Sequence, residues 1–291
     1  MRKKKIIALN GGIGNQMFQY AFARMLEFEK NCEVEFDVGF YKKTSDRTVE
    51  LTKYDTGNYV YKDHVIYNMV RRVFQRIPFL SWVAGTYKEY DQFEVDRRVY
   101  KYDYKFYYGY WQNIRYYSDI KNSLRERLRY VGEISEPTQR LKNVIKNSNS
   151  VAVHIRRGDY LNGKSIYHIL DREYYLKAIN RACLELGITD RNELNLYFFS
   201  NDIEWCRNNF ADLKNAVFVD KSISKSEHID MMLMKDAKCL IMANSTFSWW
   251  SAWLSERPDK IIIAPDRWFC DDNLNNKAKR ALIPEEWIIE K

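Results

Sequence analysis

Cysteine is scarce in this sequence, and its arrangement excludes two kinds of structure. Five cysteines occur among 291 residues, and none belongs to a Cys-x-x-Cys pair. An odd number without paired spacing predicts neither a disulfide framework nor a zinc site. We expect buried free thiols in a reducing compartment at Cys32, Cys183, Cys206, Cys239 and Cys270.

Long apolar runs are absent as well. The basic residues 1–5 precede only the short apolar run Ile6–Leu9 before a polar turn at Asn10–Gly14, which is unlike a signal peptide. No uninterrupted apolar stretch reaches the roughly 20 residues that span a bilayer. We expect a cytoplasmic protein, and the sequence leaves open a peripheral contact with the inner face of a membrane that carries lipid-linked glycans.

Glycine and proline are too sparse to mark a linker, because the chain has 11 Gly and 5 Pro and no repeat or low-complexity tract. Its length still exceeds that of a usual single domain. We predict two domains, 1–145 and 146–291, with the change of domain near Glu133–Ser150, a segment that contains Pro137 and the polar run Lys146–Ser150. The net charge of +8 suits an anionic ligand or a merely solvated basic surface. The dispersed basic residues and the lack of a nucleic-acid-binding motif argue against a nucleic-acid partner.

From residue 150 onward, short apolar runs alternate with helical patterns. The longest helical pattern is capped by Asp171 and ended by Gly187, and its apolar residues recur with a 3.6-residue period. We expect shorter helices near 202–210, 226–236 and 247–255. Alternating strands and helices predict an α/β fold with a doubly wound parallel sheet, whose ligands bind beyond the carboxyl ends of the strands. The predicted strands are Val151–Ile155, Leu194–Phe199, Ala216–Val219, Cys239–Ala243 and Lys260–Ala264.

Polar clusters stand at the ends of several of these strands, at 154–159, 200–202 and 244–250. Adjacent guanidiniums such as Arg156 and Arg157 form bidentate bonds to phosphate oxygens. The helix that begins near Ser245 has unpaired amides that favour an anion. The alternative interpretation is a solvated charge cluster and an ordinary helix cap. The convergence of the clusters favours a phosphate-rich ligand.

The first half predicts a strand at Lys5–Leu9, a glycine-rich turn and a helix over residues 15–29. Gly12 and Gly14, with Asp37 some twenty residues later, resemble a dinucleotide fingerprint and raise the alternative of an NAD-dependent enzyme. The third glycine position is Met17, which is too large for close packing of helix on strand, so this match is incomplete. The helix side chains expected to face the core are Met17, Ala21, Met25 and Phe28.

Five strings carry a family resemblance, in the order GGIGNQMFQYA, GYWQ, HIRRGDY, FSND and STFSWW, beginning at residues 11, 109, 154, 199 and 245. Together they resemble the bacterial α-1,2-fucosyltransferases of glycosyltransferase family 11. The resemblance implies a GT-B fold, in which two Rossmann-like doubly wound domains face each other across a cleft. It also implies inverting transfer of L-fucose from GDP-fucose to the 2-hydroxyl of a galactoside, without a metal or other cofactor, in glycan or surface polysaccharide synthesis. The N-terminal domain would be the acceptor side, and the C-terminal domain would bind GDP-fucose.

The resemblance also suggests roles for single residues. His154 and Asp230 match positions that contact guanine in related enzymes. The sequence has no Asp-x-Asp motif to hold a metal ion, so Arg156 would neutralise the pyrophosphate charge in its place. The residues expected to bind the sugar nucleotide are Gly14, Asn15, Gln16, His154, Arg156, Arg157, Ser200, Asn201, Asp202, Asp230, Ser245, Thr246 and Phe247.

Asp159 is the first candidate for the catalytic base, alongside Arg156 as the second catalytic residue. The alternative for Asp159 is a salt bridge that orients Arg157, and His168 and Asp171 are weaker candidates for the base. We expect acceptor contacts in the region 41–117, where the GYWQ string points to Trp111 and Gln112. A fucosyltransferase of another linkage, such as α-1,6, and a non-catalytic glycan- or nucleotide-binding module are the remaining alternatives.

Overall fold

The computed structural model describes residues 2–45, 47–65, 85–163 and 165–291. The chain divides into two compact units, Met1–Val131 and Gly132–Lys291. The boundary therefore precedes the one expected at residue 145. Helix α6 (Glu136–Lys146) belongs to the second unit because it packs against α10 (Glu227–Asp236) and its Thr138 hydroxyl donates to the carbonyl of Ile223.

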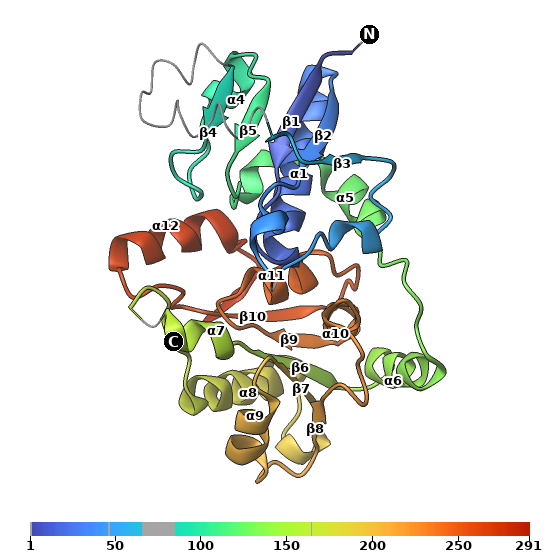
Figure 1. The fold of residues 1–291 in the computed structure, drawn as a ribbon. Helices are drawn as coiled ribbons and strands as arrows, with labels where there is room; N and C mark the ends of the chain where they lie inside the picture. Colours follow the sequence, from blue (N-terminus) through green and yellow to red (C-terminus); the bar gives the residue numbers. More distant parts are fainter. Residues whose placement is uncertain (1, 46, 66–84, 164) are drawn as a thin grey trace. The chain divides into compact units, whose positions relative to one another are not determined.

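The first unit has a five-stranded parallel sheet with the order β3-β2-β1-β5-β4 (Figure 1). Residues 66–84 of the expected acceptor region lie outside the described residues. The described strands and helices are β1 (Lys4–Ala8), α1 (Ile13–Lys30), β2 (Glu33–Asp37), β3 (Val60–Lys62), β4 (Thr86–Lys88), α4 (Arg98–Lys101), β5 (Phe106–Tyr108) and α5 (Lys121–Arg127).

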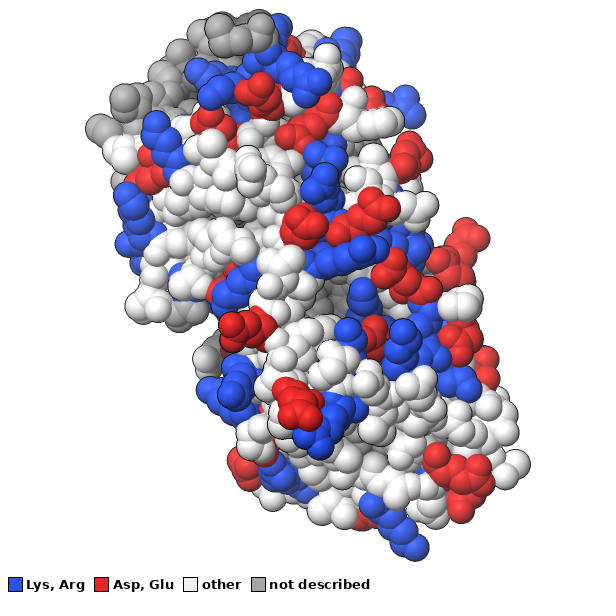
Figure 2. Space-filling view, turned by 90° about the vertical axis from the view of Figure 1, so that its right-hand side faces the viewer, with Lys and Arg blue, Asp and Glu red and all other residues white. Residues whose placement is uncertain are grey.

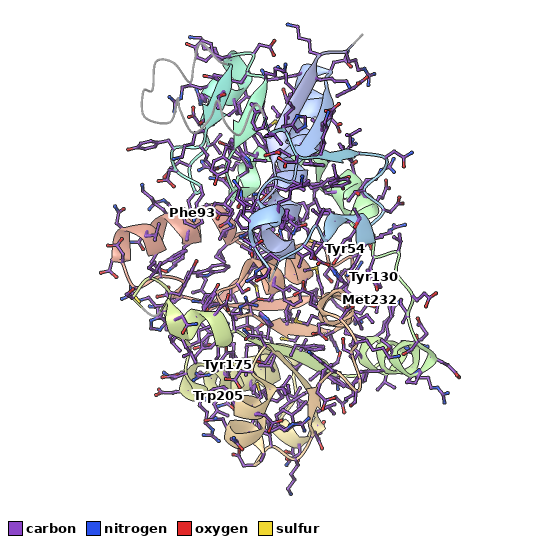
Figure 3. The ribbon with its side chains drawn as sticks, viewed as in Figure 1. Tyr54, Phe93, Tyr130, Tyr175, Trp205 and Met232 are labelled. Atoms are coloured by element: carbon purple, nitrogen blue, oxygen red, sulfur yellow. The ribbon has the colours of Figure 1, made fainter. Side chains whose placement is uncertain are left out.

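Helix α1 is buried over most of its length, because it follows β1 directly and packs on β1 and β2. Met17, Ala21 and Met25 lie in the core as predicted. Phe28 was expected to face inward, but its side chain is 68% exposed near the end of the helix, so that prediction was wrong. Aromatic rings also pack on one another in this unit. Tyr54 and Tyr130 lie edge to face, with ring centroids 6.0 Å apart (Figure 3).

The second unit has a six-stranded parallel sheet with the order β11-β10-β9-β6-β7-β8. Strands β6 to β8 extend the sheet in one direction, and β9 to β11 extend it in the other. The switch point of this doubly wound sheet therefore lies between β6 and β9. Its remaining elements are β6 (Ser150–Ile155), α7 (Gly158–Asn162), α8 (Arg172–Leu186), β7 (Asn195–Ser200), α9 (Ile203–Phe210), β8 (Ala216–Val219), β9 (Cys239–Ile241), α11 (Thr246–Trp253), β10 (Ile261–Pro265), α12 (Asp272–Leu282) and β11 (Ile288–Glu290).

Helices α8 and α9 cover one face of this sheet. The helix predicted between Asp171 and Gly187 is confirmed: Asp171 accepts the amide hydrogen of Tyr174 at 3.0 Å, and Gly187 ends α8 with φ +67°. Tyr175 and Trp205 lie on this side (Figure 3), and each ring packs edge to face on Phe210. The five strands predicted for this half are confirmed within two residues at each end.

The cysteines and the surface charges agree only in part with the sequence predictions. The five cysteines are free, but only Cys32, Cys206 and Cys239 are buried, whereas Cys270 is exposed. Lysine and arginine are interspersed with acidic residues over the face drawn in Figure 2, as the dispersed basic residues predicted. In the part of the chain that the structure describes, no helix has both the length and the apolar character needed to cross a membrane.

Candidate active site

Strand β6 carries His154 to the carboxyl edge of the second sheet. Side chains alternate along a strand, so Val153 and Ile155 join the core under α8 while His154 points to the opposite face. There its ring centroid lies 5.3 Å from that of Phe247, at the start of α11. Burial, assisted by the charge of Arg156, lowers the pKa of His154 to about 3. The imidazole is therefore neutral, with one nitrogen that donates and one that accepts.

Arg156 and Asp159 form an ion pair across the first turn of α7. The Arg156 Nη2 atom donates to Asp159 Oδ2 at 2.7 Å, and the guanidinium lies 5.7 Å from the centre of the Tyr160 ring. In this structure Asp159 pairs with Arg156, and Asn201 Nδ2 also lies 3.5 Å from its Oδ1 atom, while Arg157 faces Asp202. Whether Asp159 orients Arg157 stays a prediction.

Arg157 is held by the residues that follow β7. Its amide donates to Asn201 Oδ1 at 3.0 Å, and its guanidinium carbon lies 4.2 Å above the Trp205 ring. Its Nε atom is 3.7 Å from Asp202 Oδ2. Asp202 also caps α9, and its own amide donates to Ser200 Oγ at 2.9 Å. Ser200 at the end of β7 and the two residues after it were predicted as nucleotide contacts; in this structure Asn201 and Asp202 support Arg157, and Ser200 holds Asp202.

Gly158 permits this close approach of the two loops. A Cβ atom at that position would lie 2.4 Å from Asn201 Nδ2. Any other residue would therefore push Asn201 away from the Arg157 amide. The glycine of the RRGD string has a packing reason, independent of any ligand.

The arginine loop retains unused hydrogen-bond donors. The Nε atoms of Arg156 and Arg157 are buried, and neither has a hydrogen-bond partner among the described residues. Buried donors are nearly always satisfied in native proteins. Two such groups on adjacent guanidiniums at the end of a parallel strand are what an anionic ligand requires.

Helix α11 begins beside this loop. Ser245 is its N-cap and accepts the Phe247 amide at 3.3 Å, so Thr246 and Phe247 form the first turn. The Tyr160 hydroxyl donates to the carbonyl of Asn244 at 2.9 Å and ties α7 to this turn. Tyr160 was not among the predicted site residues. Its place in the HIRRGDY string was the signal that could have found it.

Asp230 lies on α10, which packs against both β6 and α11. Its Oδ1 atom is buried and has no hydrogen-bond partner among the described residues. Burial raises the pKa of Asp230 to about 7, with a smaller upward contribution from Glu227 and an opposing bond from Ser224. The side chain is therefore a buried acceptor that changes charge near neutral pH.

The three predicted contacts in the first unit have different surroundings. Gly14 is buried within the first turn of α1, and Asn15 Oδ1 accepts a hydrogen bond from Gln112 at 3.0 Å. Gln16 is fully buried; its amide nitrogen donates to two carbonyls, and its oxygen accepts two amides of the 48–51 segment. In this structure these bonds hold Gln16 between the first turn of α1 and the 48–51 segment, and its contact with the sugar nucleotide stays a prediction.

Trp111 is also a core residue. Its ring is inaccessible to solvent and stacks on Phe22 at a centroid distance of 3.7 Å. The expected stacking of Trp111 on an acceptor sugar is therefore wrong, although Gln112 lies at the same turn.

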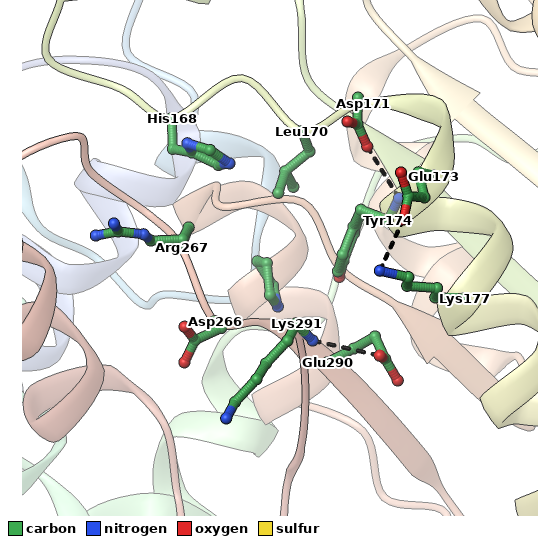
Figure 4. A pocket seen from close by; sticks show the side chains of 11 residues that line it. His168, Leu170, Asp171, Glu173, Tyr174, Lys177, Asp266, Arg267, Glu290 and Lys291 are labelled. Carbon is green, nitrogen blue, oxygen red and sulfur yellow. Dashed lines mark hydrogen bonds and ion pairs between the residues drawn. The ribbon is translucent and has the colours of Figure 1, made fainter.

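The two weaker candidates for the base line a separate pocket of about 350 Å³ in the second unit. Figure 4 shows His168 and Arg267 on one side of it and Asp171, the cap of α8, on the other. Burial and the charge of Arg267 lower the pKa of His168. The carboxylate of Asp171 is occupied by the Tyr174 amide.

The two parallel-sheet units define an α/β fold of the GT-B class. A solved α-1,6-fucosyltransferase, NodZ, soaked with GDP-fucose, shares this fold with a TM-score of 0.50 and 12% identity, over 90% of this chain and 95% of that one. The family model "Glycosyl transferase family 11" matches residues 1–291. The chain belongs to glycosyl transferase family 11.

Two curated relatives indicate how broad the family's chemistry is. An Escherichia coli α-1,2-colitosyltransferase is 34% identical, with 98% of this chain and 99% of the relative covered. A galactoside α-(1,2)-fucosyltransferase 1 from Oryctolagus cuniculus is 25% identical over 60% of this chain and 48% of its own length.

Proposed function

We propose that this glycosyltransferase transfers L-fucose from GDP-fucose to the 2-hydroxyl of a galactoside, with inversion and without a metal. The observation that carries the proposal is the pair of buried Nε donors on Arg156 and Arg157 at the switch point of the second sheet, neither of which has a hydrogen-bond partner among the described residues. Relatives named for α-1,2 transfer, and a solved fucosyltransferase with this fold, support the linkage and the donor sugar.

The second unit would bind the guanine base through hydrogen-bond acceptors and the pyrophosphate through cations and amide donors. The Asp230 carboxylate, whose Oδ1 atom has no hydrogen-bond partner among the described residues, can accept both the N1–H and the exocyclic amine of guanine, and the neutral His154 ring lies on a neighbouring element. Adenine offers neither of these two donors on its corresponding edge. The pyrophosphate would face Arg156, Arg157 and the amides at the start of α11.

The chemistry requires stabilisation of the leaving group. Breaking the bond between the sugar and the pyrophosphate places negative charge on the β-phosphate, which fixed guanidiniums and amides stabilise. The Asp159 carboxylate keeps the Arg156 guanidinium in one orientation. That contact supports an orienting role for Asp159, with Arg156 as its partner.

A second donor sugar is favoured by the relative at 34% identity, which is named for colitose. Colitose is fucose without its 3-hydroxyl, so both sugars could use the same nucleotide pocket. The test is a transfer assay with GDP-fucose and GDP-colitose against a panel of β-galactosides, followed by NMR linkage analysis. We expect an α-1,2 product from GDP-fucose. Faster transfer from GDP-colitose would make colitose, and not fucose, the donor sugar. Hydrolysis of the GDP-sugar without any transfer would contradict the proposal.

A further inference from the structure

The GYWQ string forms a strained turn at the carboxyl edge of the first sheet. It follows β5, beside the end of β4, where the Glu89 amide donates to the Tyr108 carbonyl at 2.8 Å. Trp111 has φ +59°, a left-handed conformation that a bulky residue rarely adopts. Such a conformation persists only where neighbouring groups hold it in place.

Glu89 is the group that holds this turn. Its carboxylate accepts the amide hydrogen of Tyr110 at 2.6 Å and that of Trp111 at 3.0 Å. A Cβ atom at Gly109 would lie 2.6 Å from the Glu89 side chain, so the glycine lets the carboxylate reach the turn. Two amides bonded to one charged acceptor make a stronger anchor than neutral acceptors would.

The turn also lies next to the loop that follows β1, because β1 and β5 are neighbouring parallel strands whose carboxyl ends meet at the same edge of the sheet. Gln19 joins the two loops there: its oxygen accepts the Asn10 amide, and its nitrogen donates to the Gly109 carbonyl, both at 3.1 Å. Gln112 makes the second link, to Asn15. The turn is therefore part of a rigid edge where α/β sheets bind ligands.

The turn presents one aromatic ring and buries the other. The Trp111 ring is held inside against Phe22, whereas Tyr110 is 37% exposed. Aromatic faces pack on the C–H faces of sugars, and a phenol can bond to sugar hydroxyls. The anchored main chain thus fixes the position of an accessible ring.

We propose that Glu89 is a positioning residue for the acceptor, because it fixes the Tyr110 ring as a platform for a sugar on the first unit. That the sugar is a galactoside rests on the proposed function. Glu89 acts through the turn and is not assigned a role in bond breaking.

Protonation of Glu89 should make acceptor binding depend on pH. Burial raises the pKa of Glu89 to about 7, the amides of Tyr110 and Trp111 oppose the shift, and Asp91 adds to it. Tyr116 and Tyr117 are the other titratable groups whose electrostatics involve Glu89. Since the ionised carboxylate is the better acceptor, the turn should loosen as the pH falls through 7.

The experiment uses the full chain, lactose as acceptor, and three variants. Tyr110→Ala should raise the acceptor KM about tenfold and leave the KM for GDP-fucose within twofold. Tyr102→Ala is the matched control, because this tyrosine is 40% exposed but precedes the amino end of β5. Glu89→Gln should raise the acceptor KM at pH 8 and abolish the rise that the wild type shows between pH 8 and pH 6.

The measurements also separate this proposal from the proposed function. An unchanged acceptor KM in Tyr110→Ala, or a lower kcat with unchanged acceptor KM in Glu89→Gln, would overturn the positioning role. Saturation-transfer NMR with lactose and no nucleotide tests the platform alone. We expect a lactose signal in the wild type and in Tyr102→Ala that is lost in Tyr110→Ala, and equal signals in all three would refute the platform. Absence of transfer from either GDP-sugar would refute only the proposed function.

Discussion

Asp230 should make GDP binding depend on pH. Its carboxyl group offers both oxygens as acceptors for the two guanine donors only when it is ionised, and burial raises its pKa to about 7. Guanine would bind the ionised form, so the observed Kd should scale with 1 + 10^(7−pH). This expression predicts about a tenfold weakening between pH 8 and pH 6, or about 1.4 kcal/mol. Affinity is therefore lost as the pH falls.

Calorimetric titration of GDP and IDP checks this reasoning in the wild type and in Asp230→Asn. The asparagine cannot ionise, so the Kd of the variant for GDP should not vary over this range. At pH 8 the variant should bind GDP more weakly than the wild type, by roughly 1–3 kcal/mol of binding free energy. IDP lacks the exocyclic amine, so the preference for GDP should diminish in the variant. Asp236→Asn on the same helix is the control, because Asp236 faces Lys142 instead. A wild-type Kd that changes less than twofold between pH 6 and pH 8 would refute the assignment.

The same substitution should stabilise the fold. A carboxyl group whose pKa is raised in the folded state binds its proton more tightly there, so stability is lost as the pH rises from about 4 through 7. Asp230→Asn removes that loss, which is at most roughly 4 kcal/mol at pH 8. Urea unfolding should show a more stable variant at pH 8 and little difference near pH 4. Weaker GDP binding in a less stable variant would instead indicate general damage to the fold.

Four further predictions concern the arginine loop. Arg156→Ala should reduce kcat by roughly a hundred- to a thousandfold, and Arg156→Lys should fail too, since a point charge cannot replace a planar fork; more than a tenth of wild-type turnover in either would contradict this. Transfer should survive exhaustive EDTA, and its loss with recovery on adding Mg²⁺ or Mn²⁺ would show that a metal is needed. Asp159→Asn should weaken GDP binding in calorimetry more than it lowers kcat at saturating donor, because it releases Arg156; the reverse result would make Asp159 the base. Gly158→Ala should displace Asn201 and raise the KM for GDP-fucose, with an unchanged KM counting against the support of Arg157.

Strand composition explains why the two units differed in how well the sequence predicted them, because β9 is short but wholly apolar and was still predicted. Strand β6 borders the switch point of the second unit and carries the arginine loop. It is buried on both faces, so its sequence is an apolar run with His154 near its end. Strands β3, β4 and β5 have three residues each and contain lysine or tyrosine, so they lack a readable period. Phe28 fits the apolar period of α1 but lies beyond the last packed turn.

By itself, the sequence determined the doubly wound sheet of the second unit and the identity of the residues at its edge, because apolar period, helix caps and strand ends are local properties. Only the tertiary structure decided which of those residues meet. Asp159 pairs with Arg156, Arg157 faces Asp202, and Glu89 anchors a turn some twenty residues later. Such contacts depend on the direction in which each side chain leaves its element and on the pairing of distant strands, and neither is encoded in residue type or spacing.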